Sequence, residues 1–139
     1  MEIRTQGHVA YKIQYHIVWI PKFRNKILVK GVAKYCEEVI RSSVRDRYPD
    51  VEIYDMNIQE EHIHMIVSIP PKYSISTVMK GIKSDSSRKL RKKFAYLGRK
   101  RSVWSIGYFV SSVGVDERRI RRYVRYQEKQ DKGQTKFVI

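Results

Sequence analysis

The sequence has little of what would mark an exported, disulfide-linked or membrane-spanning protein. Its 139 residues include one cysteine, Cys36, which therefore cannot form an internal disulfide. No apolar run approaches the roughly eighteen residues that a membrane-spanning helix needs. Residues 1–12 contain no apolar stretch followed by a cleavage site of small residues. We therefore expect a soluble, cytoplasmic protein with no membrane partner, in which Cys36 is a small, partly buried hydrophobic residue.

The sequence also lacks internal repeats, low-complexity linkers and a glycine-rich loop of the Walker type. A protein that binds nucleotide phosphates through such a loop is thereby excluded, and we expect no nucleotide cofactor. The length suits one domain, and a hydrophobic content of 42% is enough for a core. We expect a single domain over residues 1–139, with a loosely ordered tail from about residue 132.

Positive charge is concentrated in the second half of the chain. Residues 1–70 hold 10 basic and 9 acidic side chains, whereas residues 71–139 hold 19 and 5, and the net charge is +15. Such an excess is costly in self-repulsion unless an anionic partner is present. Nucleic acid fits best, because Lys and Arg bind phosphates and release counterions. An anionic membrane surface fits less well, because it would favour an amphipathic helix with exposed Trp, Phe or Leu opposite the charges.

The spacing of apolar residues predicts four strands and three helices. The expected strands cover residues 9–20, 51–58, 62–69 and 108–113. The expected helices cover residues 31–48, a segment that begins after an N-cap at Ser74, and a segment capped by Asp116 that ends near Asp131. This order predicts an α+β fold: a ferredoxin-like or RRM-like antiparallel sheet with helices on one face, followed by a C-terminal helix.

A pair of histidines lies in the third expected strand. Strand alternation makes His62 and His64 point the same way, opposite to Ile63 and Met65. At about 3.3 Å per residue their attachment points lie roughly 6.6 Å apart, so the two imidazoles can converge on one metal ion. An isolated pair of this kind is more often a pair of surface histidines, so the motif alone leaves both interpretations open.

In the last expected helix, Tyr123 and Gln127 stand four residues apart and so share a face. A tyrosine on an amphipathic helix usually anchors the core, and Tyr126 has the same ordinary interpretation. The surrounding arginines suit either a solvated surface or a phosphate. They are Arg118, Arg119, Arg121, Arg122 and Arg125.

Five segments, in this order and at this spacing, resemble one known family. They are residues 15–24, 61–72, 79–84 and 104–114, and the segment Arg122-Tyr123-Val124 with Gln127. Together they are similar to the single-tyrosine transposases of small bacterial and archaeal insertion sequences, which belong to the superfamily of endonucleases named for a His-hydrophobic-His (HUH) motif. The resemblance covers almost the whole chain. Glu61 stands where this family is expected to have an aspartate, a change that keeps the charge.

The resemblance implies roles for four residues. Tyr123 would be the catalytic nucleophile, and His62, His64 and Gln127 would hold a divalent metal ion, Mg²⁺ or Mn²⁺. The implied activity is excision and insertion of an insertion sequence by cutting and rejoining single-stranded DNA through a 5′-phosphotyrosine intermediate. The resemblance further implies a homodimer and DNA hairpins at the ends of the element as the substrate.

The basic half of the chain supplies candidate DNA contacts, each equally compatible with a solvated surface. They are Lys80, Lys83, Arg88, Arg91, Arg99, Arg101 and Arg122. Gly114, just before the last helix, is either the joint on which Tyr123 moves or a simple turn glycine.

Two other functions are compatible with the sequence. A non-catalytic module that binds RNA or single-stranded DNA would stack bases on aromatic side chains of an open sheet, but would leave Tyr123, Gln127 and the histidines without a joint role. A replication initiator, or a domesticated transposase acting on host repeats, would use the same chemistry in another biological setting.

Overall fold

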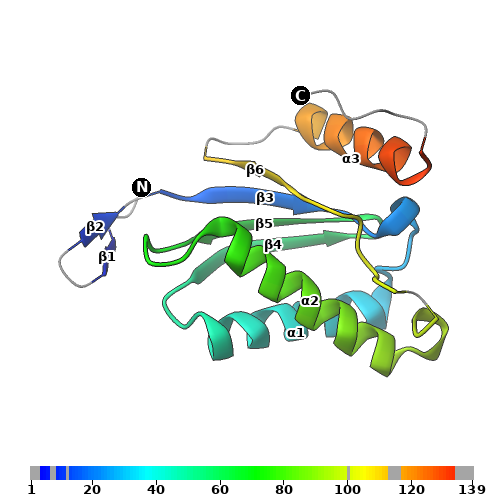
Figure 1. Ribbon diagram of the computed structural model, residues 1–139, viewed down its shortest axis with the longest axis horizontal. Helices are drawn as coiled ribbons and strands as arrows, with labels where there is room; N and C mark the ends of the chain where they lie inside the picture. The colour runs from blue at the N-terminus through cyan, green and yellow to red at the C-terminus, as the bar shows by residue number, and fades with distance from the viewer. Residues whose placement is uncertain (1–3, 7–8, 12, 100, 113–116, 134–139) are drawn as a thin grey trace.

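The computed structural model describes residues 4–6, 9–11, 13–99, 101–112 and 117–133. One antiparallel sheet has the strand order β4-β5-β3-β6. Its strands are β3 (Tyr15–Trp19), β4 (Glu52–Gln59), β5 (His62–Ser68) and β6 (Phe109–Ser111). Helices α1 (Lys30–Arg47) and α2 (Ile75–Lys93) lie together along one side of the sheet, and α3 (Glu117–Asp131) lies apart from them, next to β6 (Figure 1). The predicted ferredoxin-like α+β fold with an added C-terminal helix is confirmed.

The prediction of a single strand over residues 9–20 is wrong in its first part. β2 (Val9–Tyr11) pairs with β1 (Arg4–Gln6) in a separate two-stranded sheet, which projects beyond the main sheet (Figure 1). β5 ends at Ser68, opposite the start of β3, and two prolines follow, which restrict a continuing ladder. If β3 continued upstream, its first residues would thus have no β5 residues to pair with. Residues 9–11 pair with β1 instead.

The helices begin and end close to where the sequence predicts. Ser74 caps α2, its hydroxyl oxygen accepting a hydrogen bond of 3.0 Å from the backbone N–H of Thr77. α3 ends at Asp131 as expected. Asp116, Gly114 and most of the tail predicted from about residue 132 lie outside the described residues. Within the described part of the chain, no helix combines the length and apolar character needed to cross a membrane.

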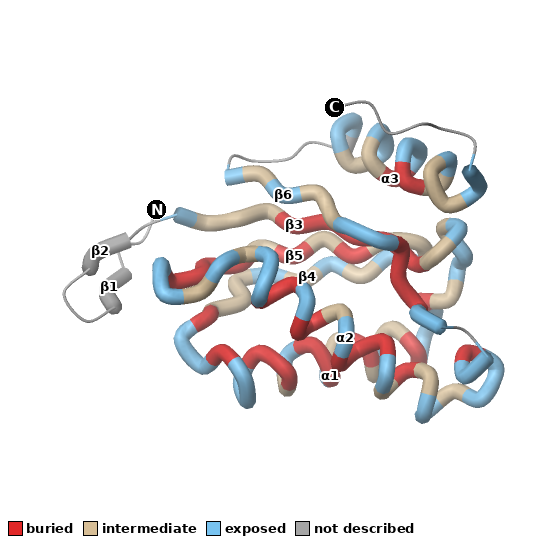
Figure 2. The backbone as a smooth tube through the Cα atoms, viewed as in Figure 1, coloured by how far each residue is buried: buried red, intermediate tan, exposed pale blue. Residues whose placement is uncertain are grey.

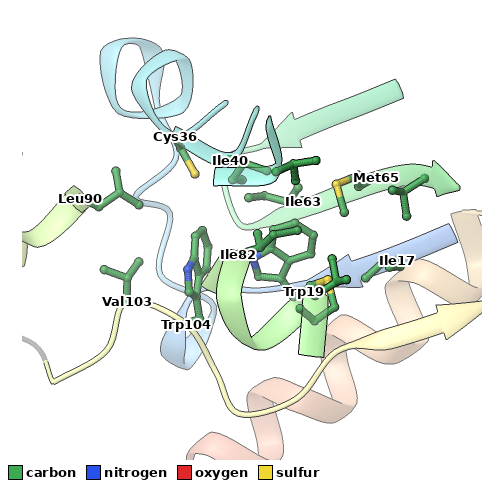
Figure 3. Close-up of a cluster of buried hydrophobic side chains, with 14 of the residues drawn as sticks. Ile17, Trp19, Cys36, Ile40, Ile63, Met65, Ile82, Leu90, Val103 and Trp104 are labelled. Carbon is green, nitrogen blue, oxygen red and sulfur yellow. The ribbon is translucent and has the colours of Figure 1, made fainter. Parts of the chain in front are cut away.

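The core lies between the sheet and helices α1 and α2. Buried segments of β3, β5 and both helices face each other there (Figure 2). Trp19 and Trp104 meet edge to face at its centre, with ring centroids 6.0 Å apart (Figure 3). Cys36 is fully buried in the same cluster, and burial raises the pKa of its thiol to about 12, so it stays protonated and acts as a hydrophobic side chain.

A short 3-10 helix, η1 (Lys22–Arg24), follows β3 and is tied to the segment that leads into β6. The backbone N–H of Lys22 donates to the carbonyl of Val103 at 2.9 Å, and that of Ser105 donates to Ile20 at 3.0 Å. A second 3-10 helix, η2 (Ala95–Leu97), follows α2. η1 lies beside the end of α3, where the candidate site is found.

Asp85 on α2 joins the two core helices through a polar cluster. Its carboxylate accepts hydrogen bonds from Ser43 at 2.7 Å and Arg47 at 2.8 Å on α1, and from Arg88 at 3.3 Å. Asp85 is buried, whereas both arginine side chains are more than half exposed. Burial alone would raise the pKa of Asp85, but these donors outweigh it and hold the pKa below its usual value.

We predict that Gly81→Ala destabilises the fold. A Cβ at position 81 would clash with the hydroxyl oxygen of Tyr48, whose ring is buried and packs against Tyr73 at a centroid distance of 5.2 Å. Alanine gains about 1 kcal/mol of helix propensity, but overpacking costs about 1–3 kcal/mol. We expect a net loss in the free energy of unfolding, measured by urea denaturation. Gly31→Ala is the control, because its Cβ would meet nothing within 4 Å. Equal stability of the two variants would contradict this packing.

We predict that Asp85→Asn removes part of the acid sensitivity of folding. Because the pKa of Asp85 is lower in the folded than in the unfolded chain, its carboxylate stabilises the fold above about pH 4 and loses this contribution as the pH falls further. At pH 7 the variant should lose roughly 1.5–3 kcal/mol, as for a hydrogen-bonded charge, with a smaller loss at pH 3. Asp46→Asn, an exposed carboxylate on α1, should change neither value. An equal loss in the free energy of unfolding of Asp85→Asn at pH 7 and at pH 3 would contradict the role of Asp85.

Candidate active site

The sheet presents its two predicted metal-binding histidines on the face away from the core. On β5, Ile63 and Met65 are fully buried against α1 and α2, so alternation turns His62 and His64 to the opposite face. In the register of the sheet, His64 lies opposite Val18 of β3. The sequence predicted this common orientation, and it is confirmed.

His62 has one ring nitrogen engaged and one available. Its Nδ1 lies 3.0 Å from a carboxylate oxygen of Glu61. A carboxylate at Nδ1 favours the tautomer with the proton there, which leaves a lone pair on Nε2. This arrangement is typical of histidines that bind metal ions, and it gives Glu61 a place in the site.

His64 is accompanied by a third histidine, His16 on β3. The Nε2 of His64 lies 3.3 Å from the Nδ1 of His16. Burial has the largest effect on His64 and lowers the pKa of its imidazole, and the nearby His16 and His62 lower this pKa further. The imidazole is therefore neutral at pH 7. Sequence reasoning did not select His16; its place on the polar side of its strand was visible, but only strand register brings it to His64.

Tyr123 on α3 is held in a closed environment. Its ring lies 5.9 Å from that of Phe109 on β6, and its buried hydroxyl has no hydrogen-bond partner among the described residues. Burial, with a smaller effect of Asp131, raises the pKa of the phenol above its usual value. The hydroxyl is therefore protonated and inaccessible in this position, and it must move before it can act as a nucleophile.

Gln127, one turn further along α3, is almost fully buried. Its Nε2 donates to an oxygen of Asp131 at 3.4 Å. The other oxygen of Asp131 accepts from the backbone N–H of Phe23 at 2.9 Å and from the hydroxyl of Ser105. Arg24 of η1 contacts Glu128 of α3 at 3.5 Å. Polar contacts thus hold the second half of α3 against η1.

Two hollows flank α3. One, of about 240 Å³, places His62 beside η1 and α3; its lining is Arg24, Glu61, His62, Ile120, Arg121, Val124 and Arg125. The other, of about 550 Å³, is lined by Phe109, Arg119, Arg122, Tyr123 and Tyr126. α3 therefore borders His62 with one flank, while the predicted nucleophile lines the hollow on its other flank.

The predicted ligands have donor atoms of the types that a divalent metal ion of the predicted kind accepts. Among the described residues no three His, Cys, Asp or Glu side chains group closely enough to hold one. A cation at this face would therefore need a donor of another type beside His62 and His64, and the amide oxygen of Gln127 is suitable chemically. Two imidazoles and an amide leave coordination positions open for a substrate, as a catalytic site requires.

The predicted DNA contacts differ in their surroundings. Arg91 and Arg101 line one hollow of about 260 Å³, and Lys80, Arg88 and Arg99 are exposed. Lys83 has an internal role that the sequence did not reveal. Its amino group donates to the carbonyls of Ser105 at 2.7 Å and Gly107 at 2.6 Å. Burial lowers the pKa of Lys83 to about 8, an effect that nearby Asp131 partly offsets.

Comparison with known proteins identifies the family. The family described as "Transposase IS200 like" matches residues 9–127. The chain is 31% identical over 132 residues to the transposase for insertion sequence element IS200 of Salmonella typhimurium, covering 93% of this chain and 86% of that protein.

Two solved structures share the fold. A putative transposase from Deinococcus radiodurans, at 25% identity, superposes with a TM-score of 0.77 over 91% of this chain and 98% of the other. A REP-associated tyrosine transposase bound to a REP hairpin gives a TM-score of 0.57 at 16% identity, over 97% of this chain and 76% of the other.

The matched segment contains the histidine pair of β5 together with Tyr123 and Gln127 of α3. Family membership implies an enzyme that cuts DNA and transfers strands. The chain belongs to the IS200-like family of HUH transposases.

Proposed function

We propose that this transposase cleaves and rejoins single-stranded DNA, with Tyr123 as the nucleophile and Mg²⁺ or Mn²⁺ held by His62, His64 and Gln127. One observation carries the proposal: His62, which has an available lone pair, and His64, which is neutral at pH 7, lie on the sheet face that α3 borders, and α3 carries both the phenol and the amide. We also propose that the protein acts in the cytoplasm.

The proposed reaction conserves bond energy. The phenol oxygen of Tyr123 attacks the scissile phosphorus and the bond to the 3′ oxygen breaks, which gives a 5′-phosphotyrosine and a free 3′-hydroxyl that takes up the proton. Attack by another 3′-hydroxyl restores the phosphodiester and returns a proton to the phenol. A divalent cation, when bound, acts as a Lewis acid on the phosphate oxygens. Because one ester replaces another, no nucleotide hydrolysis is needed.

Movement of α3 is part of this proposal. In the observed position, burial of the Tyr123 hydroxyl disfavours its ionisation, so attack requires the phenol to reach a more polar place. The contacts between α3 and η1 include a hydrogen bond and an ion pair, which can be exchanged for contacts with water or DNA. A movable nucleophile helix is thus compatible with a stable core, which lies on the other side of the sheet.

We further propose that the active form is a homodimer, as the family resemblance implies. Val110 on the edge strand β6 is 38% exposed, as is Tyr126 on neighbouring α3, and Ile106 is 83% exposed. Exposed apolar side chains beside the edge strand of a sheet favour association with a second chain.

A module that only binds nucleic acid has less support. Such a module would stack bases on aromatic side chains of the open face. Here the ring of Phe109 already packs against Tyr123, and α3 borders that face. The carboxylate at His62 would also have no purpose in base stacking.

We predict that the protein forms a covalent adduct with single-stranded DNA. Purified chain, Mn²⁺ or Mg²⁺ and a 5′-labelled or 3′-labelled oligonucleotide carrying the element's end should give a band of increased mass on a denaturing gel, labelled only from the 3′ side. Tyr123→Phe removes the nucleophilic oxygen and should abolish the adduct, as should chelation of the metal ion or His64→Ala.

Tyr126→Phe is the matched control, because Tyr126 lies on the same helix and lines the same hollow. It should retain the adduct. Loss of the adduct in Tyr126→Phe with retention in Tyr123→Phe would show that the nucleophile is wrongly assigned. Absence of an adduct with any oligonucleotide that the protein binds would support the non-catalytic alternative.

We predict that the basic half of the chain binds the DNA backbone. Arg101→Ala should weaken binding of a single-stranded oligonucleotide and reduce the slope of log K against log salt by about 0.7, the value for one phosphate contact. Arg45→Ala, an exposed arginine on α1 in the nearly neutral half, is the control and should leave the slope unchanged. Fluorescence anisotropy at several salt concentrations measures both. Equal slopes for the two variants would contradict the assignment.

A further inference from the structure

Asp131, the last residue of α3, joins three segments of the chain through its carboxylate. One oxygen accepts from the backbone N–H of Phe23 in η1 at 2.9 Å and from the hydroxyl of Ser105, and the other accepts from Gln127 at 3.4 Å. Ser105 is buried and Asp131 is half-buried. A side chain that only ended the helix would face solvent, whereas this one is surrounded by donors.

The segments that meet at Asp131 are themselves constrained. Phe23 and Arg24 have positive φ angles of 58° and 51°. Residues other than glycine rarely adopt such angles, which cost free energy. Lys83 fixes the neighbouring segment from α2 by donating to the carbonyls of Ser105 and Gly107. Asp131 therefore contacts a prearranged set of donors rather than a flexible surface.

The contact with Gln127 selects an orientation of its amide. An ionised carboxylate can only accept hydrogen bonds, so Asp131 binds the NH₂ end of the amide. The carbonyl oxygen is then the end that remains for another partner. Since a metal cation binds an amide through its oxygen, the orientation that Asp131 favours is the one that cation binding requires.

We propose that Asp131 is a positioning residue, which fixes the amide of Gln127 and the last turn of α3 for binding of the divalent cation. This inference rests on the proposed function, because it assumes that Gln127 is a ligand. Carboxylates that orient metal ligands in this way typically change metal affinity by 10–100-fold when removed. Asp131 does not itself touch the cation or the DNA in this proposal; it acts through Gln127.

Binding of Mn²⁺ to the full chain, followed by isothermal titration calorimetry without DNA, tests the proposal. We expect Asp131→Asn to weaken binding by at least 10-fold. The double variant Asp131→Asn/Gln127→Ala should bind no more weakly than Gln127→Ala alone, because the effect of Asp131 passes through the amide. Additive losses would overturn the proposal, since they would mean that Asp131 acts independently, through its charge or through the fold.

Glu128→Gln is the matched control. It removes the same charge from the same turn of α3, and Glu128 also contacts η1 through Arg24, but among the described residues its side chain forms no hydrogen bond with the amide of Gln127. We expect at most a two-fold change in Mn²⁺ affinity. A loss as large as that of Asp131→Asn would overturn the proposal in favour of a general effect of charge.

His64→Ala separates this inference from the function on which it rests. If His64→Ala and the wild type bind Mn²⁺ equally, the proposed metal site is wrong. If His64→Ala abolishes binding while Asp131→Asn retains the wild-type affinity, the metal site stands and only the role of Asp131 is wrong.

Hydrogen exchange provides a measurement that needs no metal ion. The backbone N–H of Phe23 should exchange faster in Asp131→Asn than in the wild type or in Glu128→Gln, because its acceptor is weakened. Should Asp131→Asn fail to fold, Asp131→Glu keeps a carboxylate at the end of α3 on a longer side chain and should show a smaller loss of Mn²⁺ affinity than Gln127→Ala. Wild-type exchange at Phe23, or full affinity in both variants at position 131, would overturn the proposal.

Discussion

The alternation of β5 is the constraint on which the rest of the site depends. Ile63 and Met65 must be buried against α1 and α2 to complete the core, and this requirement turns His62 and His64 to the opposite face. A shift of one residue in register would bury both imidazoles and expose the apolar side chains. The burial of Ile63 and Met65 that stabilises the sheet therefore also fixes the orientation of the predicted metal ligands. No further interaction is needed to turn both imidazoles to the same face.

The helix that carries Tyr123 and Gln127 is held in a different way. α1 and α2 contribute long rows of buried apolar residues to the core, whereas α3 contributes none to this cluster among the described residues and makes polar contacts with η1. Polar contacts of this kind exchange readily with water and with phosphates. The fold thus combines a rigid platform for the histidines with a less firmly attached helix for the proposed nucleophile. This division suits a reaction in which the phenol must first be uncovered and later returned.

Much of this arrangement could be predicted from the sequence, because it follows from local patterns. Alternation predicted the direction of the histidine pair, helical spacing predicted the shared face of Tyr123 and Gln127, and Ser74 predicted the start of α2. What could not be predicted depends on contacts between distant segments. The pairing of residues 9–11 with the N-terminal segment depends on the point at which β5 ends, and the internal role of Lys83 depends on where the segment before β6 passes. The proposed role of Asp131 likewise depends on its contacts with Phe23 and Ser105, which are distant in the sequence.

The central claim is that the imidazoles of β5 and the amide of α3 bind one divalent cation. Anomalous diffraction from crystals grown with Mn²⁺ tests it most directly, because the signal locates the ion independently of any activity. The account predicts a single strong peak within coordination distance of His62 and His64, with the amide oxygen of Gln127, from the same chain or from a second copy, as a further ligand. A peak at other side chains, or none in crystals whose histidines are accessible to Mn²⁺, would contradict it.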